Sequence, residues 1–139
     1  MKILLLEDDD PLRAIWTSTI TTAGHAVVDV ADTKEAMAYL LSAQFDMAIL
    51  DLMVGEANSL ALTHYIAYAF PKMPVLVVTG SGLFPRGGVS DIAPGVDWLM
   101  RKPLNLGDLM AMVDHANTRS GEARQASPPQ TPAWVERPQ

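Results

Sequence analysis

The chain has 139 residues, of which 49% are hydrophobic, and it carries a net charge of −6 with no cysteine. This length and apolar content predict one domain with its own core, and the lack of cysteine excludes disulfides and thiolate zinc sites. The apolar runs are too short, or too often broken by charges, for a signal peptide or a membrane span, so we expect a cytoplasmic protein. The acidic balance, without a cluster of Lys and Arg, argues against direct binding to nucleic acid.

Short apolar runs alternate with segments of helical spacing, and each run has the length of a buried strand. The first helix is predicted to begin with Asp10 as N-cap followed by Pro11, and to end near Gly24. Asp32 and Glu35 match a capping box for the second helix. The predicted strands are residues 3–6, 26–30, 47–50, 75–78 and 98–100, and the last two predicted helices are residues 59–70 and 106–117.

This alternation predicts an α/β fold, in which right-handed βαβ units build a parallel sheet. A fourth helix belongs between the last two strands, but the text there, GSGLFPRGGVSDIAPG, is rich in glycine and proline. In a helix interior these residues cost about 1 and about 3 kcal/mol each, so we expect a short helix or an irregular loop. Residues 119–139 are proline-rich and predict a flexible tail after a domain at residues 1–118.

Polar side chains follow four of the predicted strands at their carboxyl ends. Glu7 and Asp8 follow the first strand, and Asp51, Thr79 and Lys102 follow the third, fourth and fifth strands. The carboxyl ends of parallel strands share one edge of a sheet, where open α/β sheets bind ligands. Each residue alone has an ordinary explanation as a helix-end acid, a turn residue or a surface charge. Their joint placement on four strand ends favours a functional site.

The predicted convergence also explains why four acids, EDDD, stand side by side after the first strand. Clustered carboxylates raise one another's pKa unless a cation compensates, and Mg²⁺ with oxygen ligands does so. A lysine and a hydroxyl directed at the same place would complete a phosphoryl site. A carboxylate inside such a site can itself be the nucleophile.

Four segments in this order, ILLLEDDDPLR, FDMAILDLM, PVLVVTG and WLMRKPL, resemble the receiver domain of two-component response regulators. The resemblance covers about residues 1–117 and implies a doubly wound, five-stranded parallel sheet of flavodoxin-like order 2-1-3-4-5. It implies that Asp51 is the phosphoacceptor and that Thr79 is the switch hydroxyl. It also implies that Lys102 pairs with the phosphoryl group and precedes a cis bond to Pro103.

For the metal, the resemblance implies Mg²⁺ bound by Glu7, Asp8, Asp51 and the backbone carbonyl of Met53. It implies a histidine kinase or phosphotransfer protein as donor, and no enzymatic activity beyond the chain's own phosphorylation and dephosphorylation. Because the chain starts at Met1 and only a tail follows the predicted receiver, we expect a single-domain regulator that acts through protein contacts.

Two features depart from the family pattern. The stretch VGEANS replaces the usual Pro-Gly text after the phosphoacceptor, so we expect a looser segment at residues 54–59. Leu99 stands where receivers usually carry Tyr or Phe, and strand alternation predicts that Trp98 points the other way. Two alternatives stay open: a pseudo-receiver that works unphosphorylated, and an aspartate-dependent phosphatase, which would need an acid where Met53 stands.

Overall fold

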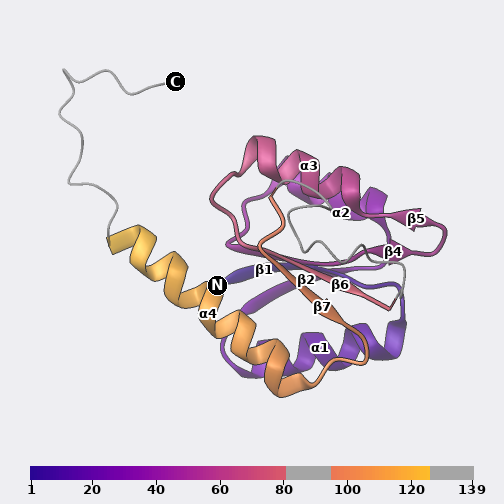
Figure 1. Cartoon of the computed structure of the whole chain (residues 1–139), viewed down its shortest axis with the longest axis horizontal. Helices are drawn as coiled ribbons and strands as arrows, with labels where there is room; N and C mark the ends of the chain where they lie inside the picture. The colour runs from indigo at the N-terminus through magenta and orange to yellow at the C-terminus, as the bar shows by residue number, and fades with distance from the viewer. Residues whose placement is uncertain (81–94, 126–139) are drawn as a thin grey trace.

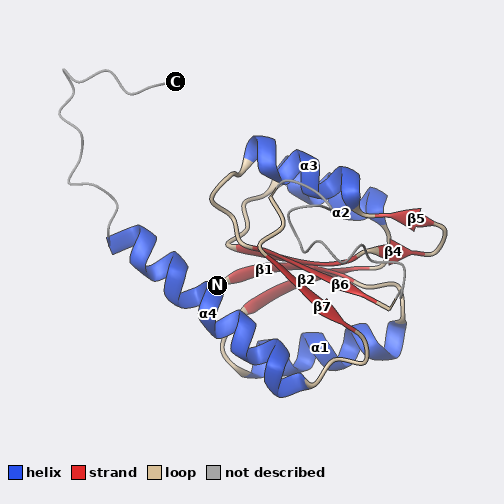
Figure 2. Ribbon diagram, viewed as in Figure 1, coloured by secondary structure: helices blue, strands red, loops and turns tan. Residues whose placement is uncertain are grey.

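A computed structural model of the chain describes residues 1–80 and 95–125, with side chains described up to residue 119. Five parallel strands form one sheet with helices on both faces (Figures 1 and 2). The elements are β1 (Lys2–Leu6), α1 (Asp10–Thr22), β2 (Ala26–Val30), α2 (Thr33–Ser42), β3 (Met47–Asp51), β4 (Met53–Val54), β5 (Ala57–Asn58), α3 (Leu60–Ala69), β6 (Val75–Thr79), β7 (Trp98–Arg101) and α4 (Leu106–Gln125).

The strand order is β2-β1-β3-β6-β7. Counted over the five strands of this sheet, it is the order 2-1-3-4-5, so the predicted α/β, flavodoxin-like fold is confirmed. All four strand pairs are parallel, so the carboxyl ends of the five strands lie along one edge. The site residues predicted from the sequence are therefore brought to the same edge.

The sheet separates two hydrophobic cores, and strand alternation assigns each side chain to one of them. In β1, Leu4 and Leu6 belong to the core beneath α2 and α3, while Ile3 and Leu5 belong to the core beneath α1 and α4 (Figure 1). All four are fully buried. Such continuous burial explains why this strand reads as an unbroken aliphatic run in the sequence.

The beginning of α1 corrects one prediction. Asp9, and not Asp10, is the N-cap, because its side chain accepts a hydrogen bond from the Leu12 backbone N–H at 2.9 Å. Asp10 is the first helical residue, and its carboxylate instead pairs with Arg13 at 2.7 Å. The expected helix end at Gly24 is confirmed, since this residue has a φ of 100° just after the last turn.

The second helix begins as predicted, with Asp32 as N-cap accepting a hydrogen bond from Glu35 N at 2.8 Å. The last helix is longer than predicted, because α4 continues beyond residue 117 to Gln125. Its extension is anchored by Arg119, which lies 5.2 Å from the Trp98 ring centre and 3.7 Å from an Asp97 oxygen. That contact comes from residues distant in sequence, so helical periodicity alone could not indicate it.

The segment after β3 is more regular than we expected. Instead of a loose stretch, β4 and β5 form a small antiparallel hairpin in which Val54 pairs with Ala57. Gly55 has a φ of 61° at the first position of the two-residue turn, where hairpins favour glycine. The hairpin therefore gives the chain after Asp51 a defined path.

Trp98 and Leu99 point to opposite faces of β7, as predicted. Trp98 packs on the side of α1 and α4, where its ring meets His115 edge-on at 5.5 Å, and Leu99 packs on the side of α2 and α3. The Lys102–Pro103 bond is cis, as the resemblance implied. The expected weak fourth helix and most of the proline-rich tail lie outside the described residues. Within the described ranges, no helix is long and apolar enough to cross a bilayer.

Replacing Gly95 with Ala should destabilise the fold more than the same change at Gly24. Both glycines have positive φ, but a Cβ at residue 95 would lie 2.8 Å from the Ala67 Cβ of α3, whereas nothing lies within 4 Å at residue 24. We expect about 1 kcal/mol of loss for Gly24→Ala from strain and on the order of 2–3 kcal/mol for Gly95→Ala from strain plus overpacking. Urea unfolding measures both, and equal losses would contradict the close approach.

Candidate metal and phosphoryl site

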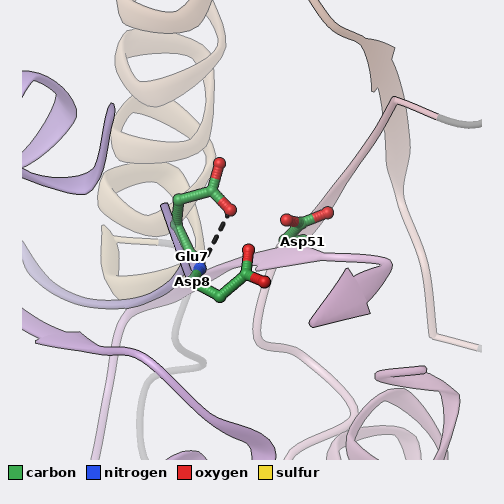
Figure 3. A group of neighbouring side chains, drawn as sticks. All are labelled: Glu7, Asp8 and Asp51. Atoms are coloured by element: carbon green, nitrogen blue, oxygen red, sulfur yellow. Dashed lines mark hydrogen bonds between the residues drawn. The ribbon is translucent and has the colours of Figure 1, made fainter. Parts of the chain in front are cut away.

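Three carboxylates from two strands meet at the carboxyl edge of the sheet. Glu7 and Asp8 follow β1, Asp51 ends β3, and one oxygen from each lies within 4.8 Å of the others (Figure 3). Pairing of β1 with β3 causes this meeting, since the register aligns Leu6 with Leu50, the residue before Asp51. The convergence predicted from the sequence is present in the structure.

Glu7 and Asp8 are adjacent in sequence but differ in environment. Glu7 is fully buried, and its backbone N–H continues the sheet by donating to Val30 O at 3.1 Å. Asp8 is exposed, and its Oδ2 accepts a hydrogen bond from Gly55 N in the hairpin at 2.9 Å. The Asp8 backbone N–H in turn donates to Glu7 Oε2 at 3.0 Å, so the Glu7 side chain is bonded to the backbone of the next residue.

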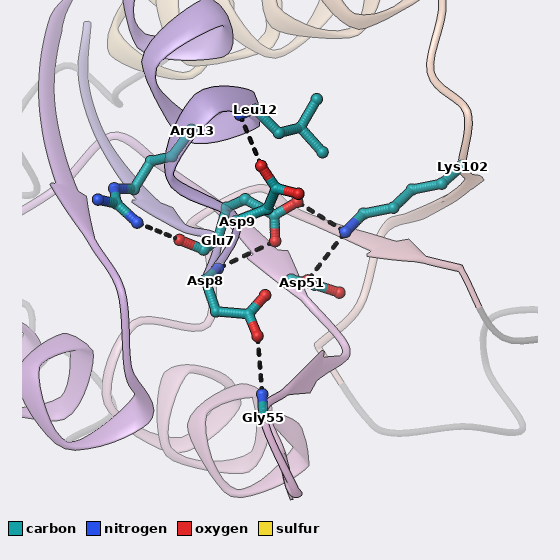
Figure 4. A network of polar contacts seen from close by, with 8 residues as sticks. All are labelled: Glu7, Asp8, Asp9, Leu12, Arg13, Asp51, Gly55 and Lys102. Carbon is teal, nitrogen blue, oxygen red and sulfur yellow. Dashed lines mark hydrogen bonds and ion pairs between the residues drawn. The ribbon is translucent and has the colours of Figure 1, made fainter.

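Lys102 is the cation that joins the acids. It follows β7, and its backbone N–H donates to Thr79 O at 2.8 Å, which continues the pairing with β6. Its Nζ donates to Glu7 Oε1 at 2.6 Å and to Asp51 Oδ2 at 3.0 Å (Figure 4). The same Nζ lies 5.9 Å from the centre of the buried Trp16 ring of α1, a weak cation–π contact.

The site carries more negative charge than Lys102 neutralises, and the pKa values reflect this. The pKa of Glu7 is raised to about 7, chiefly by burial and also by the hydrogen bond and charge of Asp51, which Lys102 only partly offsets. The Gly55 N–H lowers the pKa of Asp8. Burial opposes the charge of Lys102, but its bonds to Glu7 and Asp51 outweigh this and raise its pKa.

This donor set fits a hard divalent cation. The ligand atoms are carboxylate oxygens, which Mg²⁺ prefers, and three acids against one lysine leave charge for a cation to balance. Asp8 is exposed, so the group can be reached from solvent, whereas Glu7 and Asp51 are buried and form its inner side.

Thr79 and Met53 lie near the same edge, and their predicted roles stay predictions. Asp51 pairs with Val78, so Thr79 is one residue further along β6, at the end of that strand, and it is buried. Met53 lies two residues beyond Asp51 in β4 and has a half-exposed side chain. Its position after Asp51 agrees with a backbone carbonyl near the carboxylates.

Arg13, Gly55 and Trp16 contact the site residues and were not predicted to do so. Arg13 donates to Glu7 O at 2.8 Å, Gly55 binds Asp8, and Trp16 lies beneath the Lys102 amine. One signal in the sequence was available for Arg13, which stands three residues after Asp10 on a predicted helix. Gly55 carried no such signal, because its role depends on the hairpin turn.

The protein is a doubly wound α/β domain with an acidic group and a lysine at the carboxyl edge of its sheet, and comparison with known proteins identifies its family. The family model described as "Response regulator receiver domain" matches residues 3–114. The chain therefore belongs to the response regulator receiver domain family.

Several curated relatives are similar over most of this chain. The transcriptional regulatory protein PhoP of Escherichia coli K12 is 32% identical over 126 residues, which cover 90% of this chain and 56% of that protein. The transcriptional regulatory protein TcrA of Mycobacterium tuberculosis is 30% identical over 115 residues, which cover 80% of this chain and 44% of that protein. The chain thus spans about half the length of these relatives.

Solved structures agree on the fold. A CheY-like receiver domain protein from Methanospirillum hungatei has a TM-score of 0.76 at 22% identity, covering 87% of this chain and 97% of that chain. NtrX from Brucella abortus has a TM-score of 0.77 at 25% identity, covering 91% of this chain and 28% of that chain. The match to a nearly whole receiver chain shows that the described sheet and helices have the receiver fold.

Without a divalent cation, the stability contribution of Glu7 should fall as pH rises from its usual pKa of 4.5 to about 7. The folded state holds the Glu7 proton in this range while the unfolded chain releases it, so the contribution is full below pH 4.5 and lost above about 7. The slope is at most about 1.4 kcal/mol per pH unit.

Urea unfolding in EDTA at several pH values, for the wild type and Glu7→Gln, measures this difference. As pH rises, the free energy of unfolding of the wild type should fall relative to that of Glu7→Gln. Glu56→Gln, at the exposed hairpin turn, is the matched control and should follow the wild type. A gap independent of pH would contradict the raised pKa.

Proposed function

We propose that this chain is a phosphoryl-accepting switch of two-component signalling, in which Asp51 is phosphorylated with the help of Mg²⁺. The observation that carries the proposal is the placement of Asp51. Its carboxylate accepts a hydrogen bond from Lys102 at 3.0 Å and lies in the same carboxylate group as Glu7 and Asp8. A nucleophile, a fixed cation and a divalent-cation site are thus side by side, as aspartyl phosphorylation requires.

In this reaction an Asp51 carboxylate oxygen attacks the phosphorus of the donor. The new O–P bond forms as the donor's bond to phosphorus breaks, and the electron pair leaves with the donor group, an imidazole nitrogen of a phosphohistidine or the acetate of acetyl phosphate. Lys102 holds Asp51 Oδ2 before attack and remains beside the oxygens that gain charge. Mg²⁺ bound by Glu7, Asp8 and Asp51 would supply further positive charge to the transferring group.

Phosphorylation would replace the Asp51 carboxylate, of charge −1, with an acyl phosphate of charge roughly −2 at a buried site, and would change the partners of Lys102. In the described state Lys102 is shared between Glu7 and Asp51, so a phosphoryl group competes with Glu7 for the amine. The Thr79 hydroxyl, at the end of the neighbouring strand, is the proposed donor that moves toward the phosphoryl group. Residue 99 is Leu, so the response proceeds without an aromatic ring at that position.

A histidine kinase or a phosphotransfer protein is the proposed donor, and a cytoplasmic location follows from such a donor. The chain catalyses only its own phosphorylation and dephosphorylation in this proposal. Output is proposed through protein–protein contacts, since the net charge of −6 disfavours direct binding to nucleic acid. PhoP and TcrA are named as transcriptional regulatory proteins, but this chain matches only about half of each.

The geometry favours this function over the two alternatives. A phosphatase would need a second acid two residues beyond the nucleophile, where the chain has Met53, a thioether without acid–base chemistry. A pseudo-receiver would have no need of the lysine and three acids within contact of one another. Each of these two contrasts supports a phosphorylated receiver over the alternative function.

Incubation with acetyl phosphate and Mg²⁺ should increase the intact mass by one phosphoryl group, and Asp51→Asn should abolish the increase. The reason is that Asp51 stands at the position that matches the family's phosphoacceptor and accepts a hydrogen bond from Lys102, whereas both carboxylate oxygens of the buried Glu7 already accept hydrogen bonds. Asp108→Asn, an exposed acid in the first turn of α4, is the control and should be phosphorylated like the wild type. An unchanged mass for the wild type would count against the proposed function.

Asp8→Ala should weaken Mg²⁺ binding at least tenfold while leaving the fold equally stable or slightly more stable. The change removes an oxygen ligand and one of three mutually repelling charges, and it exposes only the Gly55 N–H to water. Isothermal titration with MgCl₂ and urea unfolding in EDTA give the two quantities. Wild-type affinity in this variant would show that Asp8 is not a metal ligand.

A further inference from the structure

Arg13 makes three hydrogen bonds with a single guanidinium group, all at the acidic end of the sheet. Nη1 donates to Glu7 O at 2.8 Å, Nε to Asp29 Oδ2 at 3.2 Å, and Nη2 to Asp10 Oδ1 at 2.7 Å (Figure 4 shows the contact with Glu7). Its side chain is only 17% exposed. A side chain so fully engaged is fixed in place, since the planar fork of arginine matches several acceptors at once.

The bond to Glu7 O completes the fixation of the backbone at the metal site. The Glu7 N–H is held by Val30 O in β2, and the Glu7 C=O is held by Arg13, which itself is bound to Asp29 in β2. Both polar groups of Glu7 are therefore tied to the same neighbouring strand. The peptide plane between Glu7 and Asp8, which determines the direction of both side chains, has a defined orientation.

We propose that Arg13 is a positioning residue for the divalent-cation site, acting through the Glu7 carbonyl to aim the carboxylates of Glu7 and Asp8 at Asp51. The inference rests on the proposed function, because it assumes that these carboxylates bind Mg²⁺. Arg13 itself binds no metal in this role, since a guanidinium is a cation without acceptor capacity.

A purely electrostatic role for Arg13 makes the opposite prediction. The Arg13 guanidinium is bound to the Glu7 backbone oxygen, and a cation beside an acidic group lowers the attraction of that group for Mg²⁺. Removal of the Arg13 charge should therefore strengthen Mg²⁺ binding if charge alone matters. Loss of the hydrogen bond to Glu7 O should weaken binding, because groups that orient metal ligands typically contribute 10- to 100-fold in affinity. The sign of the change therefore separates the two roles.

The experiment is titration of the full chain with MgCl₂ for the wild type, Arg13→Met, Arg13→Lys and Asp29→Asn. We expect about tenfold weaker binding for Arg13→Met, which keeps the length of the side chain but has no donor. Arg13→Lys keeps the charge and loses the fork, and it should also bind more weakly than the wild type. Asp29→Asn removes a charge but keeps a side-chain oxygen that can accept from Arg13 Nε and leaves the bond to Glu7 O in place, so it should stay within about threefold of the wild type.

A second measurement, made on metal-free protein, reports on the backbone at Glu7 and Asp8 directly. The Asp8 N–H donates to Glu7 Oε2, so its hydrogen exchange should become faster in Arg13→Met than in the wild type, and stay unchanged in Asp29→Asn. Arg13→Lys decides the question if Arg13→Met fails to fold. Equal exchange rates in the wild type and the Arg13 variants would overturn the proposal.

Three binding results would also overturn it. The first is an Mg²⁺ affinity of Arg13→Met that equals or exceeds that of the wild type, and the second is such an affinity in Arg13→Lys. The third is a loss of affinity in Asp29→Asn as large as the loss in Arg13→Met. Absence of Mg²⁺ binding in the wild type would instead overturn the proposed function, so failures of the two proposals are distinguishable.

Discussion

Mutual repulsion of three carboxylates is the constraint on which the rest of this structure depends. Glu7, Asp8 and Asp51 each place an oxygen within 4.8 Å of the others, and a single lysine lies among them. Such a group does not assemble through its own interactions, so the apolar sheet beneath it must hold it together. The strands that lead to the acids, β1 and β3, are buried in apolar surroundings from Ile3 to Leu6 and from Met47 to Leu50, with Leu6 and Leu50 paired directly beneath the site.

The position of Lys102 shows how the fold limits this repulsion without removing it. Its amine reaches both Glu7 and Asp51, the two buried acids, and leaves the exposed Asp8 to solvent and to a backbone N–H. Pairing a buried charge avoids the large cost of leaving it isolated, but one lysine cannot compensate two carboxylates fully. Burial raises the pKa of Glu7, and the hydrogen bond and charge of Asp51, which Lys102 does not fully offset, add to this rise. Such a site would gain from binding a divalent cation, which is the role proposed for it.

The sequence was sufficient to predict the strands, their order and the convergence of the acids with Lys102, because these depend on hydrophobic period and on the shared edge of parallel strands. It was insufficient where a side chain had two competing partners. Asp10 satisfied the local rule for a cap, but Arg13 binds its carboxylate and Asp9 caps instead. Contacts between distant elements were equally invisible, and Arg119 against Trp98 extends α4 beyond its apolar stripe.

The two neighbouring acids that follow β1, Glu7 and Asp8, show how backbone geometry can give adjacent carboxylates different environments in a candidate metal site. Burial raises the pKa of Glu7, while the Gly55 N–H lowers that of Asp8, so the exposed acid is charged and accessible before any cation arrives. That N–H belongs to the β4–β5 hairpin, which is formed by the segment that stands in place of the family's usual Pro-Gly stretch after Asp51. The turn of the hairpin depends on the positive φ of Gly55. A departure from the family pattern thus supplies a donor to Asp8, a proposed metal ligand. Since a hydrogen bond to the ionised form stabilises that form, the hairpin keeps Asp8 ready without a second cation.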